Sequence, residues 1–130
     1  MRYAPDCHVE PVREWTAAGQ RSSYEGHAGR RELAADWREA FERMDFIPQE
    51  IVDAGNPFIF LGHYRLRARG SGVEFDNPVG QILWVERGLV VRERAFADWD
   101  EALRVAGIPT AAAGSGRRAR PAASRPQREG

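Results

Sequence analysis

Residues 58–107 constrain the fold more than any other part of the chain, because they predict three long strands followed by a short helix. Glycine turns near Gly70 and at Gly88 separate runs in which apolar and polar residues alternate, the two-residue period of a β-strand. Pro78 indicates a bulge or an edge position within the middle strand. Antiparallel strands in meander order that end in a helix indicate a bent sheet able to shelter a pocket. The predicted elements are strands over residues 58–69, 73–87 and 89–98 and a helix over residues 99–107.

The preceding segment predicts one amphipathic helix between two further strands. Residues 7–12 form a short strand-like run, which Pro11 weakens. Residues 28–44 are predicted to be helical, because large apolar residues recur at helical spacing with charged residues between them. Residues 45–53 predict a strand that Pro48 interrupts. The apolar stripe of the helix consists of Leu33, Trp37, Ala40, Phe41 and Met44.

Length and charge indicate a single domain with a polar extension. The chain has 130 residues, 19 of them basic and 19 acidic, which suits one domain with its own core. Residues 109–130 hold five arginines and one glutamate among Ala, Gly, Ser and Pro, so they carry +4 and residues 1–108 carry −4. We expect residues 109–130 to be a disordered tail, because they have too little apolar surface to offset the entropy of ordering. An acidic body is a poor candidate for nucleic-acid binding.

Several other functional classes find no support in the sequence. Cys7 is the single cysteine and has no neighbouring ligand pattern, so neither an internal disulfide nor a metal site is expected. No dinucleotide-binding glycine motif, P-loop or Gly-x-Ser-x-Gly elbow occurs, and we expect no cofactor. The sequence shows neither an apolar leader nor a run of 18 apolar residues, so a cytoplasmic protein without membrane attachment is expected.

A set of short motifs in fixed order resembles a known superfamily. Individually these motifs are weak, but their order and spacing over residues 3–108 resemble the SnoaL-like branch of the nuclear transport factor 2-like superfamily. That superfamily also holds ketosteroid isomerases, limonene epoxide hydrolases and polyketide cyclases. The motifs are Tyr24-x-Gly-His-x-Gly29, Ile51-Val-Asp-Ala-Gly55, Gly70-Ser-Gly-Val73, Asn77-Pro-Val79, the turn at Gly88, and Ala95-Phe-Ala-Asp98 running into Glu101-Ala-Leu-x-x-Ala-Gly107.

The resemblance implies an α+β cone, in which a strongly curved antiparallel sheet wraps helices around an apolar pocket. It also implies a homodimer formed through the sheet. Members of the family open with helices ahead of the first strand, whereas Met1 here lies almost directly before the first predicted strand. The expected domain over residues 1–108 is therefore N-terminally shortened, or the start of the sequence is misplaced.

Two residues are candidate general acids or bases, and each could instead have a purely structural role. Asp98 ends the last strand, where this fold can direct a side chain into the cone, and an apolar cavity would raise its proton affinity. Asp98 also precedes a helix, with Glu101 three residues on, which is the pattern of an N-cap. His63 lies mid-strand beside Tyr64 and serves acid–base chemistry if its face of the strand lines the pocket. On the outer face it would be a surface or dimer-contact residue.

The remaining candidates would hold a substrate. Gln81 stands where relatives often carry His, and an amide can orient a carbonyl but cannot transfer a proton. Trp15, Trp37 and Phe96 are expected to line the cavity. The leading hypothesis is a domain that binds a small apolar organic molecule, and its catalytic form is an acid–base isomerase, cyclase or hydrolase acting through His63 and Asp98. The alternative is a non-catalytic ligand-binding or dimerising module.

Overall fold

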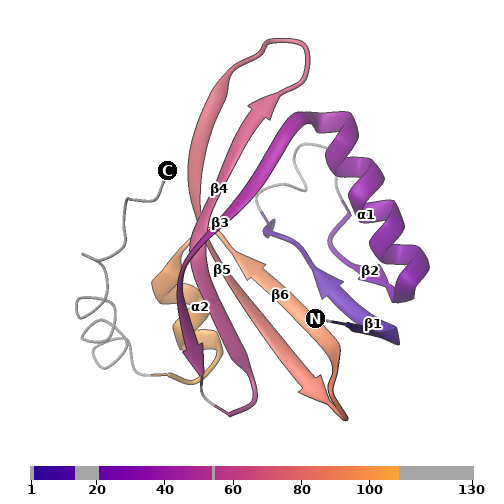
Figure 1. The fold of residues 1–130 in the computed structure, drawn as a ribbon, viewed down its shortest axis with the longest axis vertical. Helices are drawn as coiled ribbons and strands as arrows, with labels where there is room; N and C mark the ends of the chain where they lie inside the picture. Colours follow the sequence, from indigo (N-terminus) through magenta and orange to yellow (C-terminus); the bar gives the residue numbers. More distant parts are fainter. Residues whose placement is uncertain (1, 14–20, 54, 109–130) are drawn as a thin grey trace.

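The computed structural model describes residues 2–13, 21–53 and 55–108 (Figure 1). The expected tail over residues 109–130 and the candidate Trp15 lie outside the described residues. The two helices are α1 (Gly26–Ala40) and α2 (Trp99–Val105). The strands are β1 (Tyr3–Glu10), β2 (Tyr24–Glu25), β3 (Phe41–Asp53), β4 (Phe58–Ala68), β5 (Glu74–Glu86) and β6 (Leu89–Phe96).

One mixed sheet contains all six strands, in the order β2-β1-β6-β5-β4-β3. The predicted antiparallel meander is present from β3 to β6. No sequence pattern predicted that β1 pairs parallel to β6 and antiparallel to the two-residue β2. The first strand therefore lies beside the last one, which extends the meander by two strands.

The sheet curves around α1. This helix contacts β1 and β2 as well as β3, although these strands lie at opposite ends of the strand order. A flat sheet could not meet one helix at both ends, so the sheet bends and α1 lies on its concave side. The shorter α2 packs against β4, β5 and β6 on the other side (Figure 1). This arrangement is the expected α+β cone, open at its ends.

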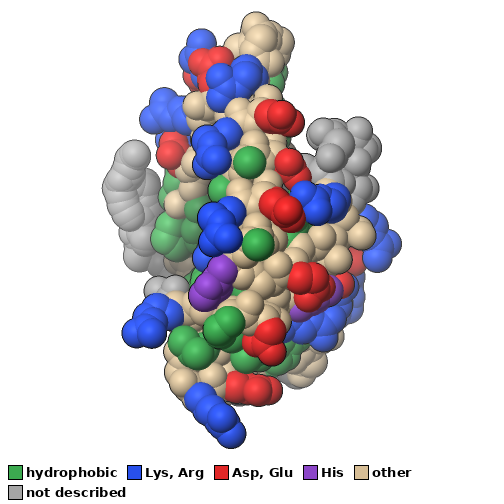
Figure 2. Space-filling view, turned by 90° about the vertical axis from the view of Figure 1, so that its right-hand side faces the viewer, with side chains coloured by type: hydrophobic (Ala, Val, Ile, Leu, Met, Phe, Trp, Pro, Cys, Tyr) green, Lys and Arg blue, Asp and Glu red, His purple; other side chains and the backbone are tan. Residues whose placement is uncertain are grey.

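The amphipathic helix is present but ends earlier than predicted. The sequence predicted a helix to residue 44, whereas α1 ends at Ala40 and Phe41 already has the extended φ of −127°. The periodicity misled because Phe41 and Met44 belong to β3, where they pair with Ala68 and Leu66 of β4. Their side chains still face the same interior as Trp37 of the helix. From the α1 side, the surface shows interspersed acidic and basic side chains, with small hydrophobic groups at the centre and larger ones toward the left and lower parts of the view (Figure 2).

Pro48 and Pro78, which were predicted to lie inside strands, are accommodated by a register shift and by an edge position, respectively. Pro48 lies inside β3 beside a register shift against β4, which is how a strand tolerates a residue without an N–H donor. Pro78 pairs with His63 of β4, while the pairing of β5 with β6 reaches only to Gly80. Pro78 therefore occupies an edge position on its other side, one of the two outcomes expected of it.

Buried side chains change from one face of β4 to the other at Gly62. Ile59 and Leu61 are fully buried beneath α2, whereas Tyr64 and Leu66 are buried on the concave side. A β-carbon at Gly62 would lie only 2.2 Å from the carbonyl oxygen of Ile47 on β3. The two backbones can approach this closely only because the residue at the crossover point has no side chain.

The described residues include no helix long and apolar enough to cross a membrane.

Replacing Gly62 should test how far the fold depends on this close approach. We expect Gly62→Ala to lower the free energy of unfolding by about 2–4 kcal/mol, because backbone must move to admit the methyl group. The matched control is Gly70→Ala, which meets no atom within 4 Å but has a φ of +91° and should cost about 1 kcal/mol. Urea unfolding of both variants gives the comparison. Equal losses of unfolding free energy in the two variants would show that the close contact between β3 and β4 can relax to admit the methyl group.

Candidate functional site

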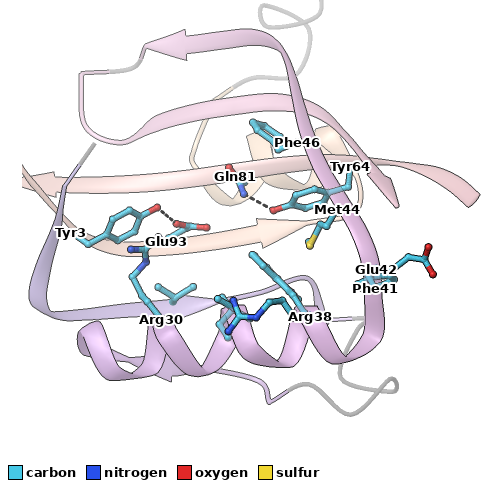
Figure 3. A pocket seen from close by; sticks show the side chains of 14 residues that line it. Tyr3, Arg30, Arg38, Phe41, Glu42, Met44, Phe46, Tyr64, Gln81 and Glu93 are labelled. Carbon is cyan, nitrogen blue, oxygen red and sulfur yellow. Dashed lines mark hydrogen bonds between the residues drawn. The ribbon is translucent and has the colours of Figure 1, made fainter. Parts of the chain in front are cut away.

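A cavity of about 490 Å³ lies between α1 and the concave side of the sheet (Figure 3). Its wall combines aromatic and aliphatic side chains with a few polar groups, as small-molecule pockets do. The helix supplies Arg30, Leu33, Ala34, Trp37 and Arg38, β3 supplies Phe41, Glu42, Met44 and Phe46, and the remaining strands supply Tyr3, Val9, Tyr64, Gln81 and Glu93.

Strand alternation places the polar groups of β4, β5 and β6 on one face. Leu83 of β5 pairs with Glu93 of β6, and Gln81 pairs with Ala95. These residues point to the concave side, as does Tyr64 on β4. The side chains between them, such as Ile82, point to α2 instead. The alternation of side chains along these three strands thus directs Glu93, Gln81 and Tyr64 into the same cavity.

Glu93 is a buried carboxyl at one end of this cavity. Its relative exposure is 9%, and it accepts a hydrogen bond from the hydroxyl of Tyr3. The guanidinium of Arg30 stacks 3.6 Å above the centre of the Tyr3 ring. Burial raises the pKa of Glu93 above its ordinary value, although the Tyr3 hydrogen bond and the charge of Arg30 oppose the rise. Burial and the neighbouring Glu93 in turn raise the pKa of Tyr3.

Tyr64 and Gln81 form a second polar pair in the same cavity. The Gln81 amide donates a 2.9 Å hydrogen bond from Nε2 to the Tyr64 hydroxyl oxygen. Trp37 and Phe46 hold the Tyr64 ring in edge-to-face contacts, with ring centres 6.3 Å and 5.5 Å away. Burial, followed by the negative charge of Glu93, raises the pKa of Tyr64. The hydroxyl therefore stays protonated at neutral pH, and the aromatic contacts fix its position.

The two residues predicted to act as general acid or base, His63 and Asp98, lie away from this cavity. His63 is on the opposite face of β4 from Tyr64, and its ring packs 5.8 Å from that of Trp99 in α2. Asp98 is the N-cap of α2, where its Oδ1 accepts a 3.0 Å hydrogen bond from the Asp100 N–H. Neither residue belongs to the lining of the cavity in the described part of the chain. Their catalytic role stays a prediction, but both residues lie on the α2 side of the sheet and outside the lining of the cavity.

The predicted substrate-binding residues divide between the two faces. Trp37 and Gln81 both line the cavity. Phe96 is 8% exposed and packs with Leu103 and other residues beneath α2. Trp15 falls outside the described residues.

Sequence reasoning missed Glu93 and Tyr3, although one of them had left a signal. Val91, Glu93 and Ala95 share one face of β6, so the carboxyl stands where the two-residue pattern calls for an apolar residue. Such a break in pattern marks either a paired buried charge or a functional group. Tyr3 had no such signal, because its position depends on the parallel pairing of β1 with β6, where Tyr3 lies opposite Val90.

The described residues contain no cluster of three or more His, Cys, Asp or Glu side chains that could hold a metal ion.

Comparison with known proteins identifies the fold of this chain through solved structures. No protein-family model and no curated protein sequence matches the chain. Solved structures do match it, at low sequence identity. An NTF2-like protein of unknown function from Burkholderia pseudomallei is 20% identical with a TM-score of 0.68, covering 78% of this chain and 77% of that one. The protein TerC, co-crystallised with polyporic acid, is 18% identical with a TM-score of 0.68, covering 78% and 80%.

A third structure is a hypothetical protein with a ketosteroid isomerase-like fold from Catenulispora acidiphila, in complex with trimethylamine. It is 16% identical with a TM-score of 0.63, and the match covers 84% of this chain and 79% of that one. Candidate SnoaL-like polyketide cyclases also match. The chain has the NTF2-like fold. The fold expected from the motifs is confirmed, and the cavity that contains Glu93 lies on the concave side of the curved sheet.

The pH dependence of stability should reveal the burial of Glu93. A carboxyl whose pKa is raised on folding stabilises the protein below its ordinary pKa of 4.5, and this contribution is lost as the pH rises through the folded value. Relative to wild type, Glu93→Gln should therefore gain stability between pH 4 and pH 8. Urea unfolding across this range measures the difference, with Glu39→Gln as the control for removing an exposed charge. A difference that does not change with pH would contradict the raised pKa.

The capping role of Asp98 can be separated from a chemical one. We expect Asp98→Ala to lower the free energy of unfolding by about 1 kcal/mol, whereas Asp98→Asn should change it little, because Asn caps a helix as well as Asp does. Thermal or urea unfolding of the two variants gives the result. Equal losses in both variants would show that the negative charge, and not the cap hydrogen bond, is what α2 requires.

Proposed function

We propose that this NTF2-like domain binds a small, largely apolar organic molecule in the Glu93 cavity and transfers a proton on it. The observation that carries the proposal is a carboxyl of raised pKa that faces an aromatic-lined cavity of about 490 Å³. A carboxyl tuned toward neutral pH by burial is suited to general acid–base chemistry. The ligands named for two neighbours of the same fold, polyporic acid and trimethylamine, are small organic molecules, which supports the binding step.

The polar groups of the cavity suggest distinct roles. Ionised Glu93 would take a proton from a carbon next to a carbonyl group, the C–H electron pair would move toward the carbonyl oxygen, and protonated Glu93 would return the proton to another atom. Tyr3 would position the carboxyl through its hydrogen bond. The Tyr64–Gln81 pair would orient the carbonyl. Isomerisation of this kind is balanced in protons and requires no other reactant.

A binding module without catalysis is the alternative proposal, because a cavity and one buried carboxyl also suit simple ligand capture.

A homodimer formed through the sheet and a cytoplasmic location stay proposals as well. Light scattering coupled to size-exclusion chromatography tests the homodimer.

Hydrogen–deuterium exchange on a bound ketone tests proton transfer directly. Wild-type protein in D₂O should accelerate deuterium uptake at the carbon next to the carbonyl of an apolar ketone such as 1-tetralone, read by mass spectrometry. Glu93→Gln should lower the accelerated rate by roughly 10²–10⁴, the usual contribution of a positioned proton-transfer group. Tyr3→Phe should have a smaller effect, because it removes only the positioning hydrogen bond.

Two matched controls distinguish this proposal from the sequence-based one. His63→Gln and Asp98→Asn alter the titratable groups on the α2 side and should leave the exchange rate unchanged. If these variants abolish exchange while Glu93→Gln does not, the reaction takes place on the other face of the sheet. If the ketone binds in the cavity without accelerated exchange in any form of the protein, the binding module is the better description.

A further inference from the structure

A buried carboxyl and two arginines of α1 line the same cavity. Glu93 and Tyr3 lie at one end, joined by their hydrogen bond. Arg38 lies eight residues beyond Arg30 on α1, which corresponds to about 12 Å along the helix axis at 1.5 Å per residue. Both arginines line the cavity, and both are exposed at its rim (Figure 3).

In the described part of the chain, the positive charge of Arg38 has no carboxylate partner. Among the described residues, no carboxylate lies within 4 Å of its guanidinium, whereas Arg21, Arg43 and Arg65 each have an acidic partner. Glu42 is the nearest acid in sequence that lines the cavity, but it pairs with Arg67 at 3.1 Å and points away from the cavity in Figure 3.

The surroundings add to this positive field. Arg30 faces the Tyr3 ring and has no carboxylate within 4 Å in the described part of the chain. A second hollow adjoins the first through Tyr3 and Arg30, and the described residues that line it are Arg2, Tyr3, Pro5, His27, Arg30 and Leu89, none of them acidic. The charge of Arg30 acts on the Glu93 carboxyl and lowers its pKa, whereas Arg38 is not among the groups that shift it. A cavity with low-dielectric walls and unpaired cations at its rim attracts anions.

We propose that the natural ligand is an apolar organic anion whose charged group pairs with Arg38 while its apolar body lies against Trp37, Phe41 and Tyr64. The opposite, uncharged end of the ligand then reaches Glu93. The inference rests on the proposed function, because it uses the same cavity. It adds the chemical class of the ligand and its direction of binding. A guanidinium suits this task, since its planar array of N–H donors matches a carboxylate or sulfonate.

Two fluorescent probes of nearly the same shape isolate the charge. Both 1-anilinonaphthalene-8-sulfonate and N-phenyl-1-naphthylamine fluoresce strongly in apolar sites, and only the first is an anion. We expect wild-type protein to bind the sulfonate more tightly than the neutral probe at low salt. Arg38→Gln should weaken binding of the sulfonate by about threefold to tenfold, the range for a charge-assisted contact that remains partly solvated, and should leave the neutral probe unchanged.

The control variant is Arg31→Gln, which removes an exposed arginine of the same helix that lines neither cavity. It should affect neither probe, which excludes a general effect of net charge. Raising the salt concentration should reduce the preference for the sulfonate in wild type and not in Arg38→Gln. Shifts in the backbone amide resonances of Trp37 and Gln81 should place both probes in the cavity, and melting curves should confirm that each variant is folded.

The outcomes separate this inference from the function on which it rests. Equal binding of the two probes by wild type, or the same loss for Arg31→Gln and Arg38→Gln, would overturn the anion site while leaving an apolar binding cavity. Failure of both probes to bind in the cavity would overturn both proposals. A loss of the neutral probe in folded Arg38→Gln would show that Arg38 shapes the cavity and does not select the charge of the ligand.

Discussion

The close passage of β3 over Gly62 is the constraint on which the rest of the structure depends. With no β-carbon at this position, the Ile47 carbonyl can lie where any other residue would place a side chain. The half of β4 before Gly62 buries its residues beneath α2, and the half after it buries them on the concave side. Gly62 also accepts a 3.0 Å hydrogen bond from Trp99 Nε1, which ties α2 to the same point. One glycine thus divides the sheet between a packed core and a cavity.

Keeping a carboxyl in that cavity is costly, and the fold offsets the cost locally. Glu93 stands among apolar residues, where an isolated charge would be strongly unfavourable. The Tyr3 hydroxyl supplies a hydrogen bond, and the nearby Arg30 supplies an opposite charge. Replacing such a group by an apolar residue would be the simpler solution for stability alone. A buried carboxyl that breaks the strand pattern is the kind of group that the proposed proton transfer would require.

The sequence predicted the four meander strands, both helices and the superfamily resemblance, because periodicity and turn residues are local. It mispredicted the end of α1, since Phe41 and Met44 keep helical spacing while their backbone is already extended. The candidate site was less predictable. Whether His63 or Tyr64 faces the cavity depends on which face of β4 is covered by α2. That choice is made by tertiary packing and cannot be read from the local sequence. The roles of Tyr3 and Glu93 likewise depend on a parallel strand pair that brings the two ends of the domain together.

Arg30 links the protonation of Glu93 to the charge of whatever occupies the cavity. Its guanidinium lowers the pKa of Glu93, in opposition to burial. An anion bound near the arginines would screen that positive charge and exclude water, and both effects favour the protonated carboxyl. By reciprocity, protonated Glu93 would favour binding of the anion. A neutral ligand would leave Arg30 unscreened and Glu93 a stronger acid. The charge of the ligand would then shift the pKa of Glu93, further upward for an anion than for a neutral molecule.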